Sequence, residues 1–195
     1  NITYYQTQAD ADTGDNPLAS PYINTSNPQT IFIRAENITT FCVESRGTTL
    51  ELLVNPLPSP ITPTPLEVCD DDNDGFVEFD LTSKDTEILG GETGVVISYY
   101  QTQADAESGT NPLASPYVNI DTPSQIVYVR AEFTTTGCYR LVSMELIINP
   151  TPDIPTDLED IAICDINLDG IEIFDLTQRA GDIYGSQDPL DYSLS

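Results

Sequence analysis

The sequence contains no histidine and no tryptophan, and Lys84 is its single lysine. Its 32 acidic residues greatly outnumber its 6 basic residues, so the formal net charge is −26. Without imidazole groups, histidine-dependent general-base catalysis and histidine-ligated zinc are excluded. The shortage of positive charge also argues against nucleic acid and anionic membrane surfaces as partners. No stretch approaches the ~20 apolar residues of a membrane span, so no direct membrane insertion is expected.

The acidity does not predict disorder, because 39% of the residues are hydrophobic and ten are tyrosines. Disorder requires low hydrophobicity together with high net charge. The apolar residues form short runs such as 31–33, 95–97 and 146–148, and the prolines and glycines lie mainly between these runs. Short apolar runs separated by turn residues are typical of an all-β chain.

The chain also repeats itself. Residues 4–24 and 99–119 differ at only four of 21 positions, and residues 69–82 return in related form as residues 164–177. The period is about 95 residues. A repeat of this length indicates a tandem array of similar structural units.

Clusters of proline indicate where one unit ends and the next begins. Five prolines lie in 56–65 and three in 150–155, and proline favours stiff, extended linkers. We therefore expect residues 66–149 to be one complete repeat, 1–55 the C-terminal part of another, and 156–195 the N-terminal part of a third. The alternative is that the unit starts at residue 1 and the prolines lie in a loop. Because there is no initiator methionine or signal peptide, we expect an internal segment of a longer protein.

Within the complete repeat, the pattern predicts several short strands, a short helix and a helical turn. The expected strands are 66–69, 76–81, 95–101, 126–132 and 139–148, the helix is 83–89, and the turn is 102–105. This density of strands is typical of an immunoglobulin-like sandwich. The predicted fold is therefore all-β, with tandem immunoglobulin-like β-sandwich repeats joined by Pro-rich linkers. Another small β-sandwich is the alternative.

Each repeat carries two cysteines, one near its start (Cys69, Cys164) and one before its last strand (Cys42, Cys138). If the first and last strands start at the same end of a sandwich, Cys69 and Cys138 lie close together. We therefore predict a Cys69–Cys138 disulfide, with the partners of Cys42 and Cys164 in flanking repeats. The alternative joins neighbours across the linkers as Cys42–Cys69 and Cys138–Cys164. Either scheme places the protein in an oxidising, extracellular compartment.

The acidic segment 70–75 fits D-x-[DN]-x-[DN]-G, the first half of a calcium-binding loop. We expect a Ca²⁺ site with a dissociation constant on the order of 10⁻⁴–10⁻³ M. The candidate ligands are Asp70, Asp72, Asp74, the carbonyl of Phe76, Glu78, and Asp80 in place of the missing twelfth-position glutamate. The third repeat offers Asp165, Asn167, Asp169 and Asp175. The alternative is a turn without metal, since Asp, Asn and Gly are ordinary turn residues.

Other chemistry has weaker support. The tyrosine doublets 4–5 and 99–100 could stack on sugar rings. More often, however, a tyrosine in a strand lies partly in the hydrophobic core and partly at its edge. A carbohydrate-binding module would need exposed, coplanar tyrosines. An acidic hydrolase would need two converging carboxylates, and no motif singles out such a pair. We therefore expect a protein that is not an enzyme.

The segments PLEVCDDDNDGFVEFDLTSKDTEILGG, YYQTQADAESGTNPLASPY and VRAE…GCY…NPTP resemble the ~95-residue tandem repeats of giant Bacteroidota surface proteins, including the flavobacterial gliding adhesin. The resemblance covers essentially the whole chain. It implies export by type IX secretion and an extracellular filament or stalk on the cell surface. Independently of the resemblance, short proline linkers and like charge along the chain predict a semi-rigid rod, which calcium near the start of a repeat would stiffen. We therefore expect a structural, adhesive function. The expected partners are neighbouring repeats, surface polysaccharide and other filament chains.

Overall fold

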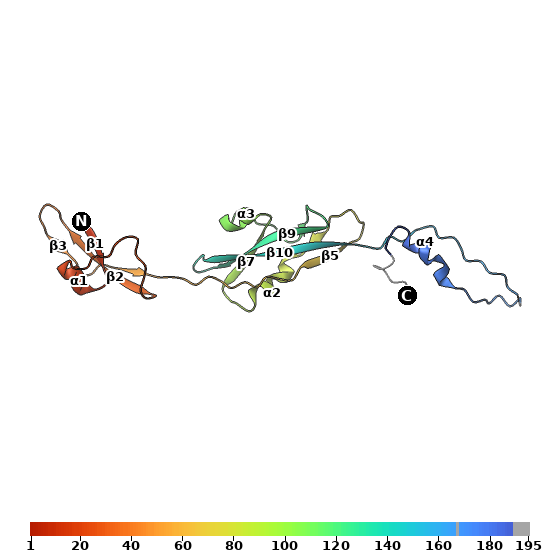
Figure 1. Cartoon of the computed structure of the whole chain (residues 1–195), viewed down its shortest axis with the longest axis horizontal. Coiled ribbons are helices and arrows are strands. Elements are labelled where there is room, and N and C mark those ends of the chain that lie inside the picture. Colours follow the sequence, from red (N-terminus) through yellow and green to blue (C-terminus); the bar gives the residue numbers. More distant parts are fainter. Residues whose placement is uncertain (167, 189–195) are drawn as a thin grey trace. The chain divides into compact units, whose positions relative to one another are not determined.

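The computed structural model describes residues 1–166 and 168–188 (Figure 1). The chain divides into two compact units. Unit 1 comprises Asn1–Pro58 together with the hairpin turn Glu132–Tyr139, and unit 2 comprises Ser59–Ala131 and the chain from Arg140 onward. The division between Pro58 and Ser59 falls inside the first proline-rich segment.

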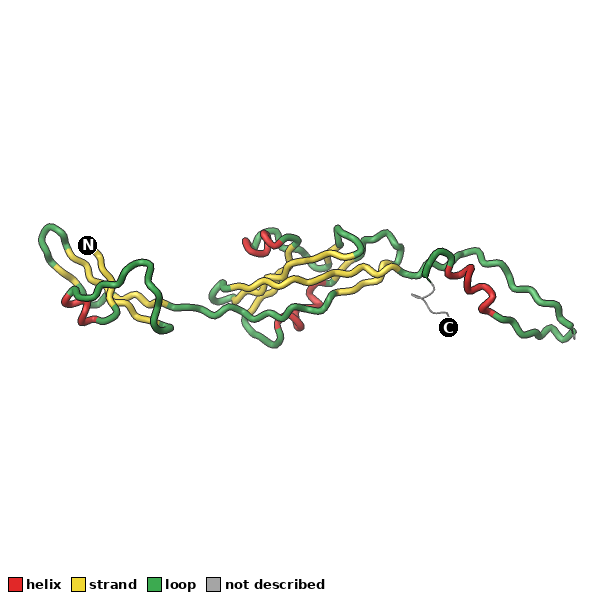
Figure 2. The backbone as a smooth tube through the Cα atoms, viewed as in Figure 1, coloured by secondary structure: helices red, strands yellow, loops and turns green. Residues whose placement is uncertain are grey.

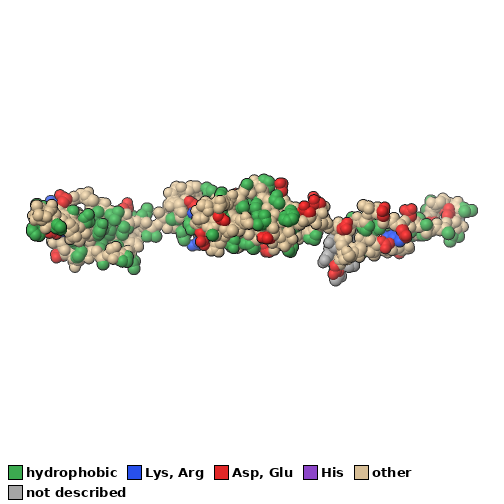
Figure 3. Space-filling model, turned by 90° about the horizontal axis from the view of Figure 1, so that it is seen from above, with side chains coloured by type: hydrophobic (Ala, Val, Ile, Leu, Met, Phe, Trp, Pro, Cys, Tyr) green, Lys and Arg blue, Asp and Glu red, His purple; other side chains and the backbone are tan. Residues whose placement is uncertain are grey.

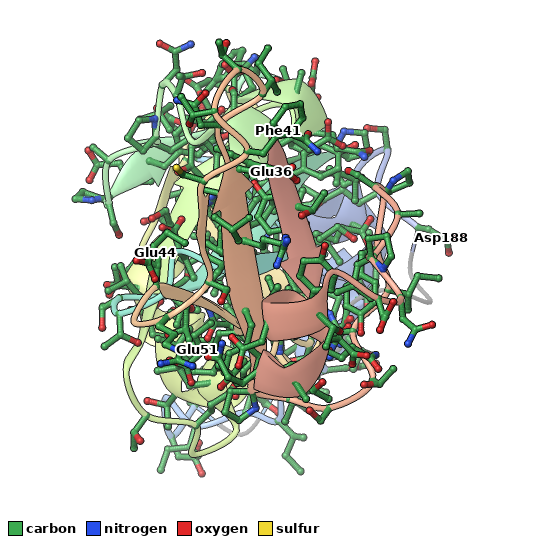
Figure 4. All side chains as sticks on the ribbon, turned by 90° about the vertical axis from the view of Figure 1, so that its left-hand side faces the viewer. Glu36, Phe41, Glu44, Glu51 and Asp188 are labelled. Carbon is green, nitrogen blue, oxygen red and sulfur yellow. The ribbon has the colours of Figure 1, made fainter. Side chains whose placement is uncertain are left out.

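Unit 1 is a small four-stranded sheet with one short helix. Its elements are β1 (Ile2–Tyr5), α1 (Gln8–Thr13), β2 (Gln29–Glu36), β3 (Val43–Glu44) and β4 (Thr49–Leu52). Strand β2 is central, since β1, β3 and β4 all pair with it in antiparallel fashion. Phe41 immediately precedes Cys42, and Figure 4 shows it at the end of the sheet where β2 carries Glu36.

Unit 2 contains a longer sheet and more helical turns (Figure 2). Its strands are β5 (Leu66–Asp70), β6 (Glu78–Phe79), β7 (Val95–Tyr100), β8 (Tyr117–Val118), β9 (Ser124–Phe133) and β10 (Tyr139–Pro150). The helical elements are η1 (Leu81–Lys84), α2 (Asp85–Leu89), α3 (Gln103–Ser108), η2 (Leu176–Arg179) and α4 (Ala180–Tyr184).

The main sheet of unit 2 has the order β5-β10-β9-β7, and β6 pairs with β8 in a second, two-stranded sheet. Strand β5 runs parallel to β10, with Leu66 opposite Leu146. Buried side chains from both layers form one core. Its members are Phe79, Leu81, Ile88, Tyr99, Val127, Val129, Met144, Leu146 and Ile148. The expected β-rich architecture of packed sheets with few, short helices is therefore confirmed.

The repeated block YYQTQADA builds the same local structure in both units. Thr7 and Thr102 cap the first turn of α1 and α3, and each accepts a hydrogen bond from the backbone N–H three residues later. Both helices end at a glycine with positive φ, Gly14 and Gly109. A threonine cap followed seven residues later by the helix-ending glycine explains why these helices are so short.

An arginine at the same repeat position supports each helix. Arg34 on β2 donates to the carbonyls of Ala11 and Asp12, both at 2.9 Å. Arg130 on β9 donates to the carbonyls of Ala106 and Glu107, at 2.9 and 3.0 Å. Because helix C-terminal carbonyls carry partial negative charge, a cation there is favourable.

Part of the first proline-rich segment belongs to the body of unit 2. The Ile61 N–H donates to the carbonyl of Ile88 at 2.9 Å, and the Thr64 N–H donates to the Glu87 carboxylate at 2.6 Å. The Ser59 N–H also donates to Glu92 at 2.9 Å. Residues 59–65 therefore lie against the α2 region instead of spanning free space.

The expected strand at 76–81 is much shorter in the structure. Only Glu78–Phe79 form a strand, because Asp80 caps η1 by accepting a hydrogen bond from the Thr82 N–H. The helix expected at 83–89 begins as η1 at Leu81 and continues as α2 to Leu89. A side-chain cap at Asp80 thus starts the helical segment before the strand can continue.

Acidic side chains outnumber basic ones over the visible surface, and hydrophobic side chains are exposed on unit 1 (Figure 3). Among the described residues, no helix has both the length and the apolar character needed to cross a membrane.

Candidate functional site

The predicted acidic loop forms a compact turn after β5. Ligand-capable oxygens of Asp70, Asp72 and Asp74 all lie within 4.8 Å of one another. Calcium–oxygen distances are about 2.3–2.6 Å, so two oxygens on one ion can be separated by about this distance. The structure therefore brings together three of the predicted ligands in a spacing that one calcium ion can bridge.

Asp70 is the buried member of this group, with 3% of its surface exposed. Its Oδ2 accepts a hydrogen bond from the Gly75 N–H at 2.6 Å, whereas its Oδ1 has no hydrogen-bond partner. A buried carboxylate oxygen without a partner is costly unless a proton, water or cation satisfies it. The unpartnered oxygen of Asp70 therefore leaves a position at this turn that a water or a cation can satisfy.

The shape of the turn depends on Asn73 and Gly75, which have φ values of +55° and +88°. The Phe76 N–H donates to Asp74 Oδ1 at 2.8 Å and so closes the second half of the turn. At Gly75, an added Cβ would lie 3.1 Å from Thr122 Cγ2. Both the backbone conformation and the close neighbour favour glycine here.

Two asparagines hold this turn against other parts of unit 2. Asn73 exchanges two hydrogen bonds with the backbone of Thr151, just after β10. Asn119 is 1% exposed, accepts from the Val77 N–H at 2.7 Å and donates to the Gly75 carbonyl at 2.8 Å. Sequence reasoning missed the role of Asn119, although its position at the end of the repeated block, matching Asn24, was an available signal.

The remaining predicted ligands of this repeat lie elsewhere. The carboxylate of Asp80 accepts from the hydroxyl and the N–H of Thr82 and from the Ser115 hydroxyl, and these bonds, the Thr82 hydroxyl first and the Ser115 hydroxyl second, lower its pKa. Glu78 lies on β6 opposite Val118. Neither carboxylate belongs to the acidic group around Asp70, and the structure gives Phe76 no role there beyond its N–H bond to Asp74. The expectation that Asp80 replaces the twelfth-position ligand is therefore wrong, because this residue is engaged as a helix cap.

The second copy of the motif forms a similar turn. The Gly170 N–H donates to Asp165 Oδ2 at 2.8 Å, and the Ile171 N–H donates to Asp169 Oδ1 at 2.8 Å. Asp175 caps η2 through the Thr177 N–H, as Asp80 caps η1. Asn167, the other predicted ligand, lies outside the described residues.

The four cysteines are all free thiols, and Cys42, Cys69 and Cys164 are exposed. In the parallel register, Cys69 lies opposite Asn149, which is eleven residues beyond Cys138 along β10. At about 3.3 Å per residue, this length of strand spans about 36 Å. A disulfide requires Cα atoms within about 7 Å. The predicted Cys69–Cys138 bond is therefore wrong: the parallel direction was correct, but β5 pairs with the far end of a much longer β10.

The tyrosine doublets do not form the platform that sugar stacking requires. Tyr5, Tyr99 and Tyr100 are at most 4% exposed, and Tyr4 is 42% exposed. The Tyr99 hydroxyl donates to Asp85 at 2.6 Å, and burial followed by this hydrogen bond raises the pKa of Tyr99. These side chains serve mainly the cores of the two units.

The sequence repeat and the fold thus define a tandem repeat protein with β-rich units and exposed cysteines, and unit 2 carries the acidic turn. Residues 1–58 and 65–152 match the family model described as the Flavobacterium inter-domain disulphide bond domain. The chain belongs to this family. No curated protein matches the chain.

Proposed function

We propose that this chain is a stretch of an extracellular, immunoglobulin-like rod that serves adhesion at a bacterial surface and is not an enzyme. The observation that carries the proposal is the path of the chain through unit 2. Residues 59–65 lead into β5, which is parallel to β10 and pairs with its C-terminal half. The chain therefore enters near the start of β10 and leaves at the end of β10. Units with entry and exit at opposite ends are suited to an extended array.

The two cysteines of a repeat have opposite places in this path. Cys138 directly precedes β10, at the entry end, whereas Cys69 lies opposite Asn149, at the exit end. When repeats follow one another, the exit end of one is joined to the entry end of the next. We therefore propose that a cysteine of the Cys69 type in one repeat pairs with a cysteine of the Cys138 type in the following repeat. The family description, which names an inter-domain disulphide, supports a bond of this kind.

Formation of this bond is a two-electron oxidation. Each thiol loses its proton, a sulfur–sulfur bond forms, and an external disulfide such as oxidised glutathione accepts the two electrons and leaves as two thiols. This chemistry fits an oxidising location outside the cytoplasm. Covalent links across the junctions would resist separation of neighbouring units under load.

We further propose that the turn at Asp70, Asp72 and Asp74 binds Ca²⁺ and stiffens the exit end. The support is the clustering of three carboxylates and the buried, unpartnered Asp70 Oδ1. Asn73 ties the same turn to Thr151, where the chain leaves β10. A cation that orders the turn would therefore also order the first residues of the second proline-rich segment.

The location is tested on the cells that produce the protein. A protease added to intact cells should release fragments of the repeat without lysis, and type IX secretion predicts that blocking this export route abolishes release. A cytosolic protein sealed in the same cells is the control. Fragments that appear only after lysis would rule out a surface rod. Surface polysaccharide and other filament chains remain the proposed adhesive partners, and binding of cell-wall polysaccharide to the purified chain tests the former.

A further inference from the structure

The chain enters and leaves the main sheet of unit 2 along two neighbouring strands that run in the same direction (Figure 1). These strands, β5 and β10, pair in parallel over five residue pairs, from Leu66–Leu146 to Asp70–Pro150. The entry segment 59–65 joins the N-terminal end of β5, and the exit at Thr151 follows the C-terminal end of β10. Tension between entry and exit therefore pulls β5 backward and β10 forward, along the direction of the strands.

This direction of pull places the β5–β10 pair in shear. Hydrogen bonds between strands run across the strand axis. When the two strands slide past each other, all of these bonds lengthen together, so the five residue pairs share the force. If the strands were instead separated from one end, each pair would carry the force alone in its turn. The parallel register therefore resists a pull along the strands better than a pull across them.

Side-chain hydrogen bonds cross the same boundary at its exit end. The Asn149 amide on β10 donates to the Glu67 carboxylate on β5 at 3.2 Å. Just beyond the strands, the Thr151 hydroxyl donates to the Asp70 carbonyl at 2.8 Å, and the Thr151 backbone exchanges two hydrogen bonds with Asn73. Sliding β10 forward would stretch these bonds as well, so they add to the resistance of the strand pair.

The boundary between β5 and β10 is also the one that such a pull has to break. β10 is held by β9 on its other side, whereas β10 is the only strand to which β5 is hydrogen-bonded in the described part of the chain. Leu66 and Val68 pack against the core and so oppose withdrawal of β5. The hydrogen bonds of Ser59, Ile61 and Thr64 to the α2 region are reached one after another from the entry, so they should break before β5 moves.

We propose that the β5–β10 pair is the element of the repeat that bears tension, and that it keeps unit 2 folded when the chain is stretched. This inference deepens the proposed rod function and rests on that function for the source of the tension. Where a disulfide leaves β5 at Cys69, tension passes to the following repeat without crossing to β10. The strand pair therefore carries the force in repeats whose cysteines are reduced.

The test stretches single molecules of the full chain in an optical trap under reducing conditions. Cys42, Cys138 and Cys164 are replaced by serine, so that Cys69 is the one thiol for attachment. Held by its two ends, the chain should lengthen by about 300 Å when residues 59–151 unfold, because an extended residue spans up to about 3.6 Å and the folded path is about 40 Å. Held by Cys69 and its C-terminal end, the chain is peeled from the Asn149 end of the pair, and rupture should need about half the force or less.

Two matched variants separate mechanical resistance from general stability. Val127 on β9 is fully buried, so Val127→Ala should lower the free energy of unfolding in urea at least as much as Val68→Ala on β5. In the end-to-end pull, however, Val68→Ala should lower the rupture force more, because only Val68 lies on the sheared strand. Equal rupture forces in the two pulling directions would overturn the proposal, as would a larger loss of force in Val127→Ala. Either result would leave the protease and cysteine-pairing experiments, which test the rod itself, unaffected.

Discussion

Asn73 and Thr151 are 78 positions apart and exchange two hydrogen bonds: Thr151 N–H to Asn73 Oδ1 at 3.0 Å and Asn73 Nδ2 to Thr151 O at 3.2 Å. The first residue lies in the acidic turn, and the second follows the last strand of the unit. The Thr151 hydroxyl also donates to the Asp70 carbonyl at 2.8 Å. The candidate calcium turn and the exit of the chain are therefore one connected structure.

Replacing Asn73 by glycine should distinguish the contribution of these hydrogen bonds to stability from the contribution of the backbone conformation. Asn73→Gly keeps the positive φ but loses both bonds, so we expect unfolding of unit 2 to become easier by about 1–2 kcal/mol. Asn73→Ala loses the bonds and also strains the backbone at φ +55°, so its loss should be larger. Urea denaturation measures the free energy of unfolding of both variants. Equal stability of Asn73→Gly and the wild type would show that the exchange with Thr151 contributes nothing.

Calcium should stabilise the chain through the three clustered carboxylates. At 10 mM Ca²⁺ and a dissociation constant on the order of 10⁻⁴–10⁻³ M, binding adds about 1.4–2.7 kcal/mol to the free energy of unfolding. Thermal melting with Ca²⁺ and with a chelator measures this change as a shift in Tm.

The matched variants for this experiment are Asp72→Asn and Asp71→Asn. Both remove one negative charge from neighbouring exposed residues, but Asp71 is not in the clustered group. Asp72→Asn should lose most of the calcium-dependent shift, and Asp71→Asn should keep it. Identical shifts in the two variants would indicate general charge screening in place of a site.

The cap of α3 should make stability depend on pH. The Thr102 hydroxyl, followed by Asn111, lowers the pKa of Asp105 from its ordinary value of 3.8. A carboxylate with a lowered folded-state pKa contributes stability above its unfolded-state pKa, and this contribution is lost as pH falls through the folded value. Thr102→Ala should cost about 0.5–2 kcal/mol at neutral pH, and the cost should shrink as pH drops below 3.8.

Denaturation of Thr102→Ala from pH 7 to pH 2.5 checks this prediction, with exposed Thr93→Ala as the control. A cost that stays constant through the acid range would show that the hydroxyl supports only the backbone N–H of Asp105 and not its carboxylate.

Glu87 should hold residues 59–65 against unit 2. Its carboxylate accepts from the Thr64 N–H and from Lys84, and these contacts, the Thr64 N–H first, lower its pKa. Glu87→Ala should therefore speed amide hydrogen exchange at Thr64 by about tenfold or more, as one charge-assisted hydrogen bond is lost. Glu107→Ala, on α3, is the control. Unchanged exchange at Thr64 would mean that the prolines alone fix this segment.

The repeat pattern predicted much of the architecture. The period follows from units of the same kind along the chain, and the apolar alternation follows from strands that bury one face in the core of their unit. It also predicted the clustered Asp70, Asp72 and Asp74, since alternate residues of a tight turn face one centre. The register of β5 with β10 could not be predicted. Both strands are apolar, and the pairing depends on how residues 59–65 pack against α2, which leaves Cys69 opposite Asn149.

The role of Asp80 shows a second limit. An aspartate one position from a ligand site and an aspartate that caps a helix look the same in sequence. Only the position of Thr82 and Ser115 around its carboxylate decides between them. Asn119 was missed for a related reason, because its partners Gly75 and Val77 lie more than 40 positions away.

The most direct test of the proposed rod is the pairing of its cysteines. Equal amounts of ¹⁵N-labelled and unlabelled full chain are oxidised with glutathione disulfide, digested without reduction and mapped by mass spectrometry. The opposite places of Cys69 and Cys138 predict cross-links that join Cys69 or Cys164 to Cys42 or Cys138 of another molecule, so labelled–unlabelled pairs should be abundant. Cross-links confined to single molecules, as Cys42–Cys69 with Cys138–Cys164 or as Cys69–Cys138, would contradict the proposal.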